Sequence, residues 1–119
     1  MNVKQSQIGE WVRKTFGDES CDDPRERSLR FIEEAIEMVQ SVGAVTPSEI
    51  FQLVDKKFAA PPGDTKQEAG GVYITFLALC HQQQIGAKTC LHKEWQRIND
   101  PNTQEILQRK QAAKKAEGL

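Results

Sequence analysis

Three glutamates, Glu33, Glu34 and Glu37, occur within five successive positions of the segment RFIEEAIEMVQ, residues 30–40. In a helix, Glu37 lies one turn from each of the other two, and like charges at these spacings destabilise a helix by about 0.2–0.5 kcal/mol per pair. Arg30 can offset part of this repulsion from the preceding turn, but no Lys or Arg follows within the next turn. Such an acidic face is most commonly a solvated surface, and the alternative is a site that holds cations.

A fourth carboxylate, Glu68, stands near the start of residues 65–84, which carry almost no charge and are apolar nearly all round over residues 72–80. This pattern predicts a buried central helix, and a carboxylate that enters such a helix needs a partner. Gly70 and Gly71 have low helix propensity and would let another backbone or a ligand approach closely.

If this helix packs against the glutamate-rich helix, four carboxylates converge on one cleft. Such a group is stable only around cations, and oxygen ligands without Cys or His favour Mg²⁺ or Mn²⁺ over zinc. Hard divalent ions held by carboxylates typically serve phosphate chemistry. A metal-dependent reaction on a phosphate compound is therefore the function that these residues favour.

Composition sets limits on the class of protein. The chain has 119 residues and a net charge of -1, with 38% hydrophobic and 28% charged residues, which predicts one soluble domain over residues 1–119 with a modest core. The charge argues against non-specific nucleic-acid binding. No apolar run follows a basic start, so no signal peptide is expected. The one long uncharged stretch, residues 69–87, is too polar for a membrane span.

The cysteines do not form a disulfide framework, because Cys21, Cys80 and Cys90 are odd in number and widely spaced. This usage fits a reducing cytoplasm. A zinc site would have to combine Cys80, His81, Cys90 and His92. Adjacent helical residues such as Cys80 and His81 point about 100° apart, and no C-x-x-C pair is present, so we favour buried thiols and surface histidines.

Helix start and stop signals recur along the chain, while strand signals are scarce. Thr46 with Glu49 forms a capping-box pattern, Asp64 is a predicted N-cap, and Pro24 and Pro101 stand at first helical positions. The sequence predicts an all-α fold, a small antiparallel helical bundle, with a solvated and frayed tail at about 108–119. The expected helices span residues 5–16, 23–43, 46–58, 65–84, 88–99, and a last one after Pro101.

The two acidic segments together resemble a known family. "EEAIE", followed some thirty residues later by "QEAGGV", is similar to the E-E-x-x-E … E-x-x-D signature of the MazG-like, all-α nucleoside triphosphate pyrophosphohydrolases. "RERSLRFIEEAIEMVQSVG", "QEAGGVYITFLALC" and "KQAAK" resemble more specifically a phage and prophage branch of that family. The resemblance covers about residues 11–114.

The resemblance implies an enzyme with a divalent metal. The family's proteins are helical bundles that form dimers or dimers of dimers, and they use Mg²⁺ to direct water at a nucleotide's phosphate chain, giving a monophosphate and pyrophosphate. Carried over by position, Glu34, Glu37 and Glu68 match metal ligands. Glu33 matches the acid that holds a further metal or activates the water. For a phage protein the location would be the host cytoplasm.

One position departs from the family's pattern. Gly71, three residues after Glu68, stands where the broader family has Asp, which removes one carboxylate and leaves the number of metal ions open. Similar E-x-G-G segments belong to the phage branch, so we interpret the glycine as a feature of that branch. Asp64, one turn before Glu68, is a candidate substitute.

The substrate implied by the resemblance needs cationic and apolar contacts. Arg30 and Lys66, each close to a glutamate segment, are candidates for the phosphates, and Lys110 on the tail could close over them. Trp11 is a candidate for the base, although an aromatic stripe more commonly builds a core. Because phages of this branch use such enzymes to reshape the deoxynucleotide pool, a purine deoxynucleotide, dGTP first, is the expected substrate.

The sequence also predicts an oligomer, and two functions other than an enzyme are weighed against the enzymatic one. The nearly all-apolar helix has more surface to bury than a chain of this size easily covers, which predicts a homodimer or homotetramer. The main alternative is a non-enzymatic helical interaction module whose glutamates form a solvated face. A helix-turn-helix DNA binder is disfavoured, because no basic recognition helix is present.

Overall fold

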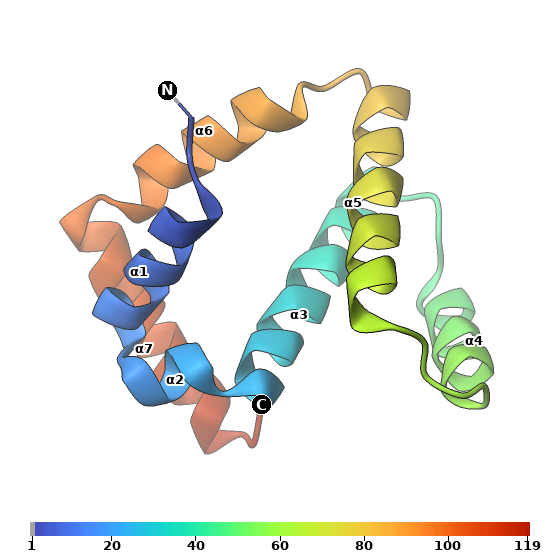
Figure 1. The fold of residues 1–119 in the computed structure, drawn as a ribbon, viewed down its shortest axis with the longest axis horizontal. Coiled ribbons are helices and arrows are strands. Elements are labelled where there is room, and N and C mark those ends of the chain that lie inside the picture. Colours follow the sequence, from blue (N-terminus) through green and yellow to red (C-terminus); the bar gives the residue numbers. More distant parts are fainter. Residues whose placement is uncertain (1) are drawn as a thin grey trace. The chain divides into compact units, whose positions relative to one another are not determined.

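Seven α-helices and no strand make up residues 2–119, the part of the chain that the computed structural model describes (Figure 1). The predicted all-α class is confirmed. None of these helices is long and apolar enough to cross a membrane. The helices are α1 (Gln5–Phe16), α2 (Asp18–Asp22), α3 (Pro24–Val42), α4 (Pro47–Phe58), α5 (Thr65–Gln82), α6 (Ala87–Ile98) and α7 (Pro101–Ala116).

Capping side chains fix where several helices begin. Thr46 accepts a hydrogen bond from the backbone N–H of Glu49 at 3.2 Å, and the Glu49 carboxylate accepts from the Thr46 backbone at 3.0 Å. Asp64 accepts from the backbone N–H of Gln67 at 3.1 Å at the start of α5. These bonds satisfy backbone donors that a helix leaves free at its first turn, so the predicted capping positions are confirmed.

The chain divides into two units, which are described separately. Unit 1 comprises the residues up to Ile32 and Gly86–Leu119, and unit 2 comprises Glu33–Ile85. Helix α3 therefore begins in unit 1 and ends in unit 2.

Unit 1 contains the closely packed helix pairs, which are α1 with α2, α1 with α7, and α6 with α7. The indole N–H of Trp11 on α1 donates to the carbonyl of Ile98 at the end of α6 at 3.2 Å. The Trp11 and Phe16 rings meet edge to face, with centroids 5.6 Å apart. Both rings are half-buried, and a satisfied indole N–H is typical of a Trp that packs against its neighbours.

Helix α2 differs from the prediction, which left residues 18–22 outside any helix. The guanidinium of Arg13 binds Asp18 at 2.8 Å and Asp22 at 2.7 Å, at opposite ends of this five-residue helix. These bonds raise the pKa of Arg13 and hold the pKa of Asp22 below its usual value. A helix of this length is too short to show an apolar period in the sequence.

The C-terminal segment also differs from the prediction of a frayed tail. Helix α7 continues to Ala116, and its Lys115 lies 3.2 Å from Glu26 of α3. The guanidinium of Arg25 donates to the carbonyl of Gly118 at 2.9 Å. Most side chains of the segment are exposed, as expected, but these contacts hold its backbone in a helix.

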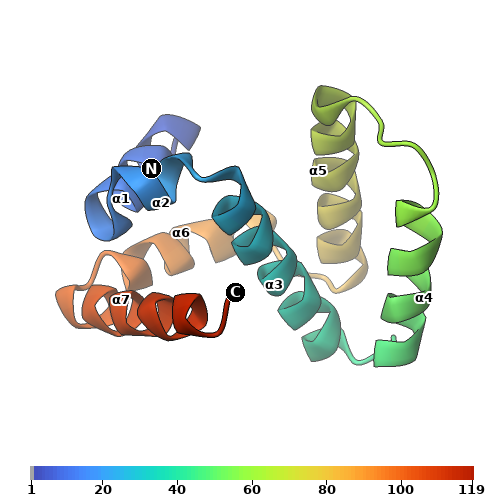
Figure 2. The ribbon, with the colours of Figure 1, turned by 90° about the horizontal axis from the view of Figure 1, so that it is seen from below.

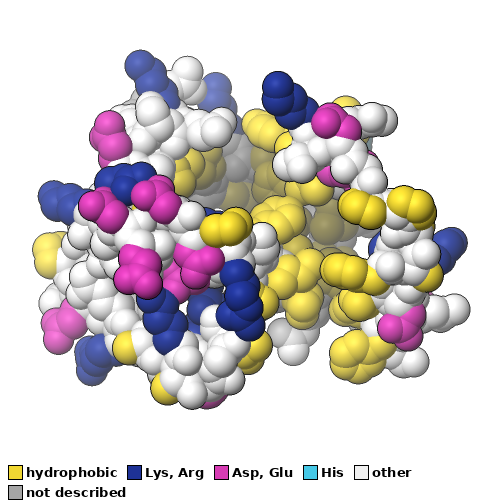
Figure 3. Space-filling model, turned by 60° about the horizontal axis from the view of Figure 1, so that its bottom comes forward, with side chains coloured by type: hydrophobic (Ala, Val, Ile, Leu, Met, Phe, Trp, Pro, Cys, Tyr) yellow, Lys and Arg dark blue, Asp and Glu magenta, His cyan; other side chains and the backbone are white. Residues whose placement is uncertain are grey.

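Unit 2 contains the end of α3 together with α4 and α5. Figure 2 shows α4 and α5 joined by the loop over residues 59–64. Its side chains are largely exposed: Cys80 is the only buried hydrophobic residue within residues 2–119, while Tyr73 and Ile74 on α5 are 67% and 70% exposed. In Figure 3, hydrophobic side chains gather where α4 and α5 lie. The expectation that α5 is a buried central helix is therefore wrong for a single copy of the chain.

Candidate functional site

The three glutamates of the first acidic segment all lie on α3. The helix begins at Pro24 after Asp23, whose carboxylate accepts a hydrogen bond from the backbone N–H of Arg25 at 2.9 Å. Glu34 and Glu37 are exposed, and Glu33 is half-buried. Because the helix is continuous, the one-turn spacing of Glu37 from Glu33 and from Glu34 is realised, and the predicted acidic patch is present on α3.

Glu68 stands in the first turn of α5 and is exposed. This position is favourable for a carboxylate, because the backbone N–H groups of a helix N-terminus carry partial positive charge. Its Oε1 atom lies 3.1 Å from the place that a Cβ would take at Gly63. The side chain thus folds back toward the loop that leads into α5, and a larger residue at Gly63 would force it to move.

The four carboxylates do not converge within one copy of the chain. Among residues 2–119, no three side chains of His, Cys, Asp or Glu lie close enough together to hold a metal ion. Helices α3 and α5 are also not among the pairs that pack closely. The residues of a single copy therefore do not fit the Mg²⁺ or Mn²⁺ cluster that the sequence predicts.

The predicted phosphate-binding cations lie on three helices. Arg30 is half-buried on α3, and its guanidinium donates to the carbonyl of Leu119 at 2.6 Å. Lys66 is exposed in the first turn of α5, beside Glu68 in the sequence. Lys110 is exposed on α7 in unit 1. Of these, Lys66 shares a helix turn with a predicted ligand, and Arg30 lies one turn before Glu34 on α3.

Two further predicted residues have opposite surroundings. Trp11 lies in unit 1, where its indole N–H is already bonded to Ile98 and its ring packs on Phe16. A Cβ added at Gly71 would meet no atom within 4 Å. The space beside Gly71 that the sequence predicts is therefore open in a single copy, whereas Trp11 is engaged in packing.

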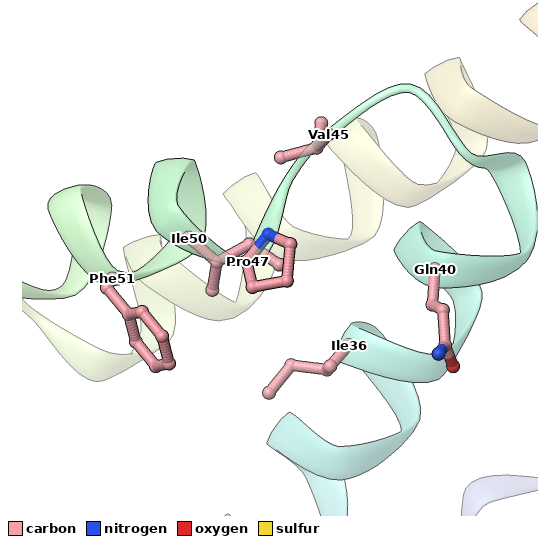
Figure 4. Close-up of a pocket in the computed structure, with 6 residues that line it drawn as sticks. All are labelled: Ile36, Gln40, Val45, Pro47, Ile50 and Phe51. Carbon is pink, nitrogen blue, oxygen red and sulfur yellow. The ribbon is translucent and has the colours of Figure 1, made fainter.

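A pocket of about 360 Å³ in unit 2 was not predicted from the sequence. Ile36 of α3 faces Ile50 and Phe51 of α4 across it, as Figure 4 shows. Its lining is mostly apolar and comes from α3, α4 and the segment between them: Ile36, Gln40, Val45, Pro47, Ile50 and Phe51. None of the glutamates of the acidic patch lines this pocket.

A buried carboxylate in unit 1 was also missed. Glu26 is only 4% exposed and lies 3.0 Å from Arg27 and 3.2 Å from Lys115. Burial alone would raise the pKa of Glu26, but hydrogen bonds from Ser20, Lys115 and Arg27 outweigh it and hold this pKa below its usual value. In the sequence Glu26 stands three residues after Asp23 and looks like a glutamate of a capping pattern. Its buried ion pair could not be predicted, because Lys115 is far away in the sequence.

Comparisons with known proteins found no relative of the chain. No protein-family model matches the chain, and neither a curated protein nor a solved structure matches it at a significant level.

Proposed function

We propose that the chain is a nucleoside triphosphate pyrophosphohydrolase, which cleaves a (deoxy)nucleoside triphosphate to the monophosphate and pyrophosphate. The observation that carries the proposal is the placement of the two acidic segments. Glu33, Glu34 and Glu37 form one patch on a continuous helix, and Glu68 stands in the first turn of a second, nearly uncharged helix. Both segments are at least partly open to solvent, which a site for a soluble nucleotide requires.

The proposal includes Mg²⁺ or Mn²⁺ as the cofactor and a homodimer or homotetramer as the active form. Carboxylate oxygens are ligands that both ions prefer. Because one copy does not bring the four carboxylates together, the active form has to differ from an isolated copy. Arg30, Lys66 and Lys110 are the candidate phosphate contacts, and dGTP is the first substrate to test.

The experiment that tests this function is pyrophosphate release from a panel of nucleoside and deoxynucleoside triphosphates. The protein should release pyrophosphate with Mg²⁺ or Mn²⁺ and stop when EDTA removes the metal. The matched control is Glu34→Gln, which keeps the size of the side chain and removes its charge. Absence of pyrophosphate release from every triphosphate with both metals would contradict the proposal.

A non-enzymatic interaction module is the second candidate function. The observation that favours it is the combination of separated carboxylates with a largely exposed apolar surface on α4 and α5. Thermal unfolding with and without Mn²⁺ separates the two functions. A ligand at one hundred times its Kd stabilises a protein by about 2.7 kcal/mol, so a carboxylate cluster should raise Tm clearly, while a solvated acidic face should leave it unchanged.

A further inference from the structure

The pocket in unit 2 has the size and the lining of a site for a small organic molecule. Its volume is about 360 Å³, and ligand pockets in proteins are typically about 300–1,000 Å³ and mostly apolar, with a few polar groups that orient the ligand. Five of its six lining residues are apolar, and Gln40 is the polar one. All six belong to unit 2, so the pocket is a feature of that unit alone.

Phe51 and Gln40 supply the two kinds of contact that a nucleobase uses. Phe51 is 68% exposed, and its ring faces Ile36 across the pocket (Figure 4). An accessible aromatic ring can stack on any base, because every base has a π face. Gln40 carries a donor and an acceptor on one carboxamide, and this group makes no hydrogen bond to another residue within residues 2–119. A planar heterocycle with hydrogen-bonding edges therefore matches the lining better than a purely apolar chain does.

The pocket residues of α3 share a face of that helix with two of the glutamates. Ile36 stands three residues after Glu33, and Gln40 stands three residues after Glu37. Residues at this spacing are neighbours on a helix surface. At a rise of 1.5 Å per residue, Gln40 lies about 4.5 Å beyond Glu37 along the helix axis and about 10.5 Å beyond Glu33. The two glutamates do not line the pocket, but they follow it along α3 toward the start of the helix.

We propose that this pocket binds the base of a nucleotide, with Phe51 stacking on the base and Gln40 hydrogen-bonding to its edge. A single sugar separates the base of a nucleotide from its phosphates, so a base held here places the phosphates at the Glu37 end of the acidic patch. This placement of the phosphates rests on the proposed function, whereas binding of the base does not. The pocket also supplies the base contact that Trp11 does not, since Trp11 is engaged in packing in unit 1.

Binding of the base is tested without phosphates or metal. Deoxyguanosine, deoxyadenosine, deoxycytidine and thymidine are titrated in EDTA into isotope-labelled protein, and the amide chemical shifts report the binding site and Kd. We expect the shifts to change at the residues that line the pocket. Phe51→Ala should raise Kd about tenfold, because it removes the stacking ring. Phe58→Ala is the matched control and should leave Kd unchanged, because Phe58 is also an exposed ring of α4, at 86%, but does not line the pocket.

The hydrogen bonds of Gln40 are tested by Gln40→Leu. This variant keeps the approximate size of the side chain and removes its donor and acceptor. The differences in Kd among the four nucleosides should therefore shrink, while stacking on Phe51 is kept. Gln52→Leu, at an exposed position of α4 that does not line the pocket, should leave these differences unchanged. Undiminished differences in Gln40→Leu would overturn the assignment of Gln40.

Turnover separates this inference from the proposed function. In an active enzyme Phe51→Ala should raise KM about tenfold with kcat nearly unchanged, because the ring contacts the base and not the reacting phosphate. Phe51-dependent binding of nucleosides by a protein that hydrolyses no triphosphate would support the base site and reject the proposed function. A wild-type protein that binds none of the four nucleosides, or a Phe51→Ala protein that binds them as tightly as wild type, would overturn the base site whether or not triphosphates are hydrolysed.

Discussion

Lys115 on α7 lies 3.2 Å from Glu26 on α3, and this ion pair joins the C-terminal helix to the start of α3 around a buried carboxylate. Lys115 is half-exposed, and its Nζ also donates to the Ser20 hydroxyl at 3.0 Å. Arg27 contacts the other carboxylate oxygen of Glu26 at 3.0 Å. Two cations and one buried anion meet here, so the carboxylate is the member that the others depend on.

Removal of the Glu26 carboxylate should destabilise the protein more than removal of Lys115. Glu26→Ala leaves Arg27 and Lys115 without their shared anion, and the loss of a buried hydrogen-bonding partner costs about 1–3 kcal/mol. Lys115→Met removes a half-exposed cation and should cost about 1 kcal/mol or less, because solvent screens such pairs. Urea unfolding followed by circular dichroism gives both values. The control Glu19→Ala, at an exposed position of α2, should stay within about 0.5 kcal/mol of wild type.

Stability should also fall in acid through Glu26. Its pKa is lowered in the folded protein, so its stabilisation is complete above the pKa of an unfolded glutamate, about 4.3, and is lost as pH falls through the lower folded value. We therefore expect the unfolding free energy of wild type to drop below about pH 4.3 more steeply than that of Glu26→Gln. Urea titrations from neutral pH to about pH 3 measure the two curves. Parallel curves would show that Glu26 does not titrate in this way.

The helices could be predicted because their signals are local. Thr46 with Glu49 and Asp64 satisfy backbone donors within one turn, and these residues mark the starts of α4 and α5 in sequence and structure alike. Helix α2 was not predicted, and the contacts of Arg13 with its Asp18 and Asp22 come from another helix. A five-residue element has no apolar period of its own.

The acidic patch on α3 was predictable from the sequence, whereas the packing of α3 relative to α5 was not. The acidic patch on α3 follows from spacing alone, and the structure realises it. Convergence of Glu68 with that patch depends on how α3 and α5 pack, which is a contact between distant segments. The apolar composition of α5 predicted a buried helix, but it could not show that one copy leaves this surface exposed.

Neutralisation of the carboxylates should separate turnover from folding. We expect Glu34→Gln, Glu37→Gln and Glu68→Gln each to abolish pyrophosphate release. Tm should stay at the wild-type value or above it for the two α3 variants and fall slightly for Glu68→Gln, which loses a favourable charge at the start of α5. Relief of like-charge repulsion along α3 contributes a few tenths of a kcal/mol to stability, at about 0.2–0.5 kcal/mol per pair. Turnover at saturating Mg²⁺ and thermal unfolding without metal are the two measurements. A variant that keeps the wild-type rate would lose its assignment as a ligand.

The last prediction concerns Gly71, which stands where the resembled family has Asp. Position 71 lies one turn beyond Glu68 on the same face of α5, and a Cβ there meets no atom within 4 Å. A single copy can therefore accept Gly71→Asp without strain, and its helix should gain a few tenths of a kcal/mol, because Asp has a higher helix propensity than Gly. Any functional penalty must come from what approaches this face in the active protein.

We expect Gly71→Asp to raise KM strongly or abolish turnover while Mn²⁺ affinity is kept or improved. A missing ligand alone would not explain why Gly70 is also glycine, since two glycines cost roughly 1–2 kcal/mol of helix propensity relative to alanine. Space for the nucleotide explains both, and a new carboxylate would fill that space and repel the phosphates. Gly71→Ala is the control, because it adds a Cβ without charge: a rise in KM with Asp alone indicates repulsion, and a rise with both indicates crowding. An unchanged KM in Gly71→Asp would show that the substrate does not use this space.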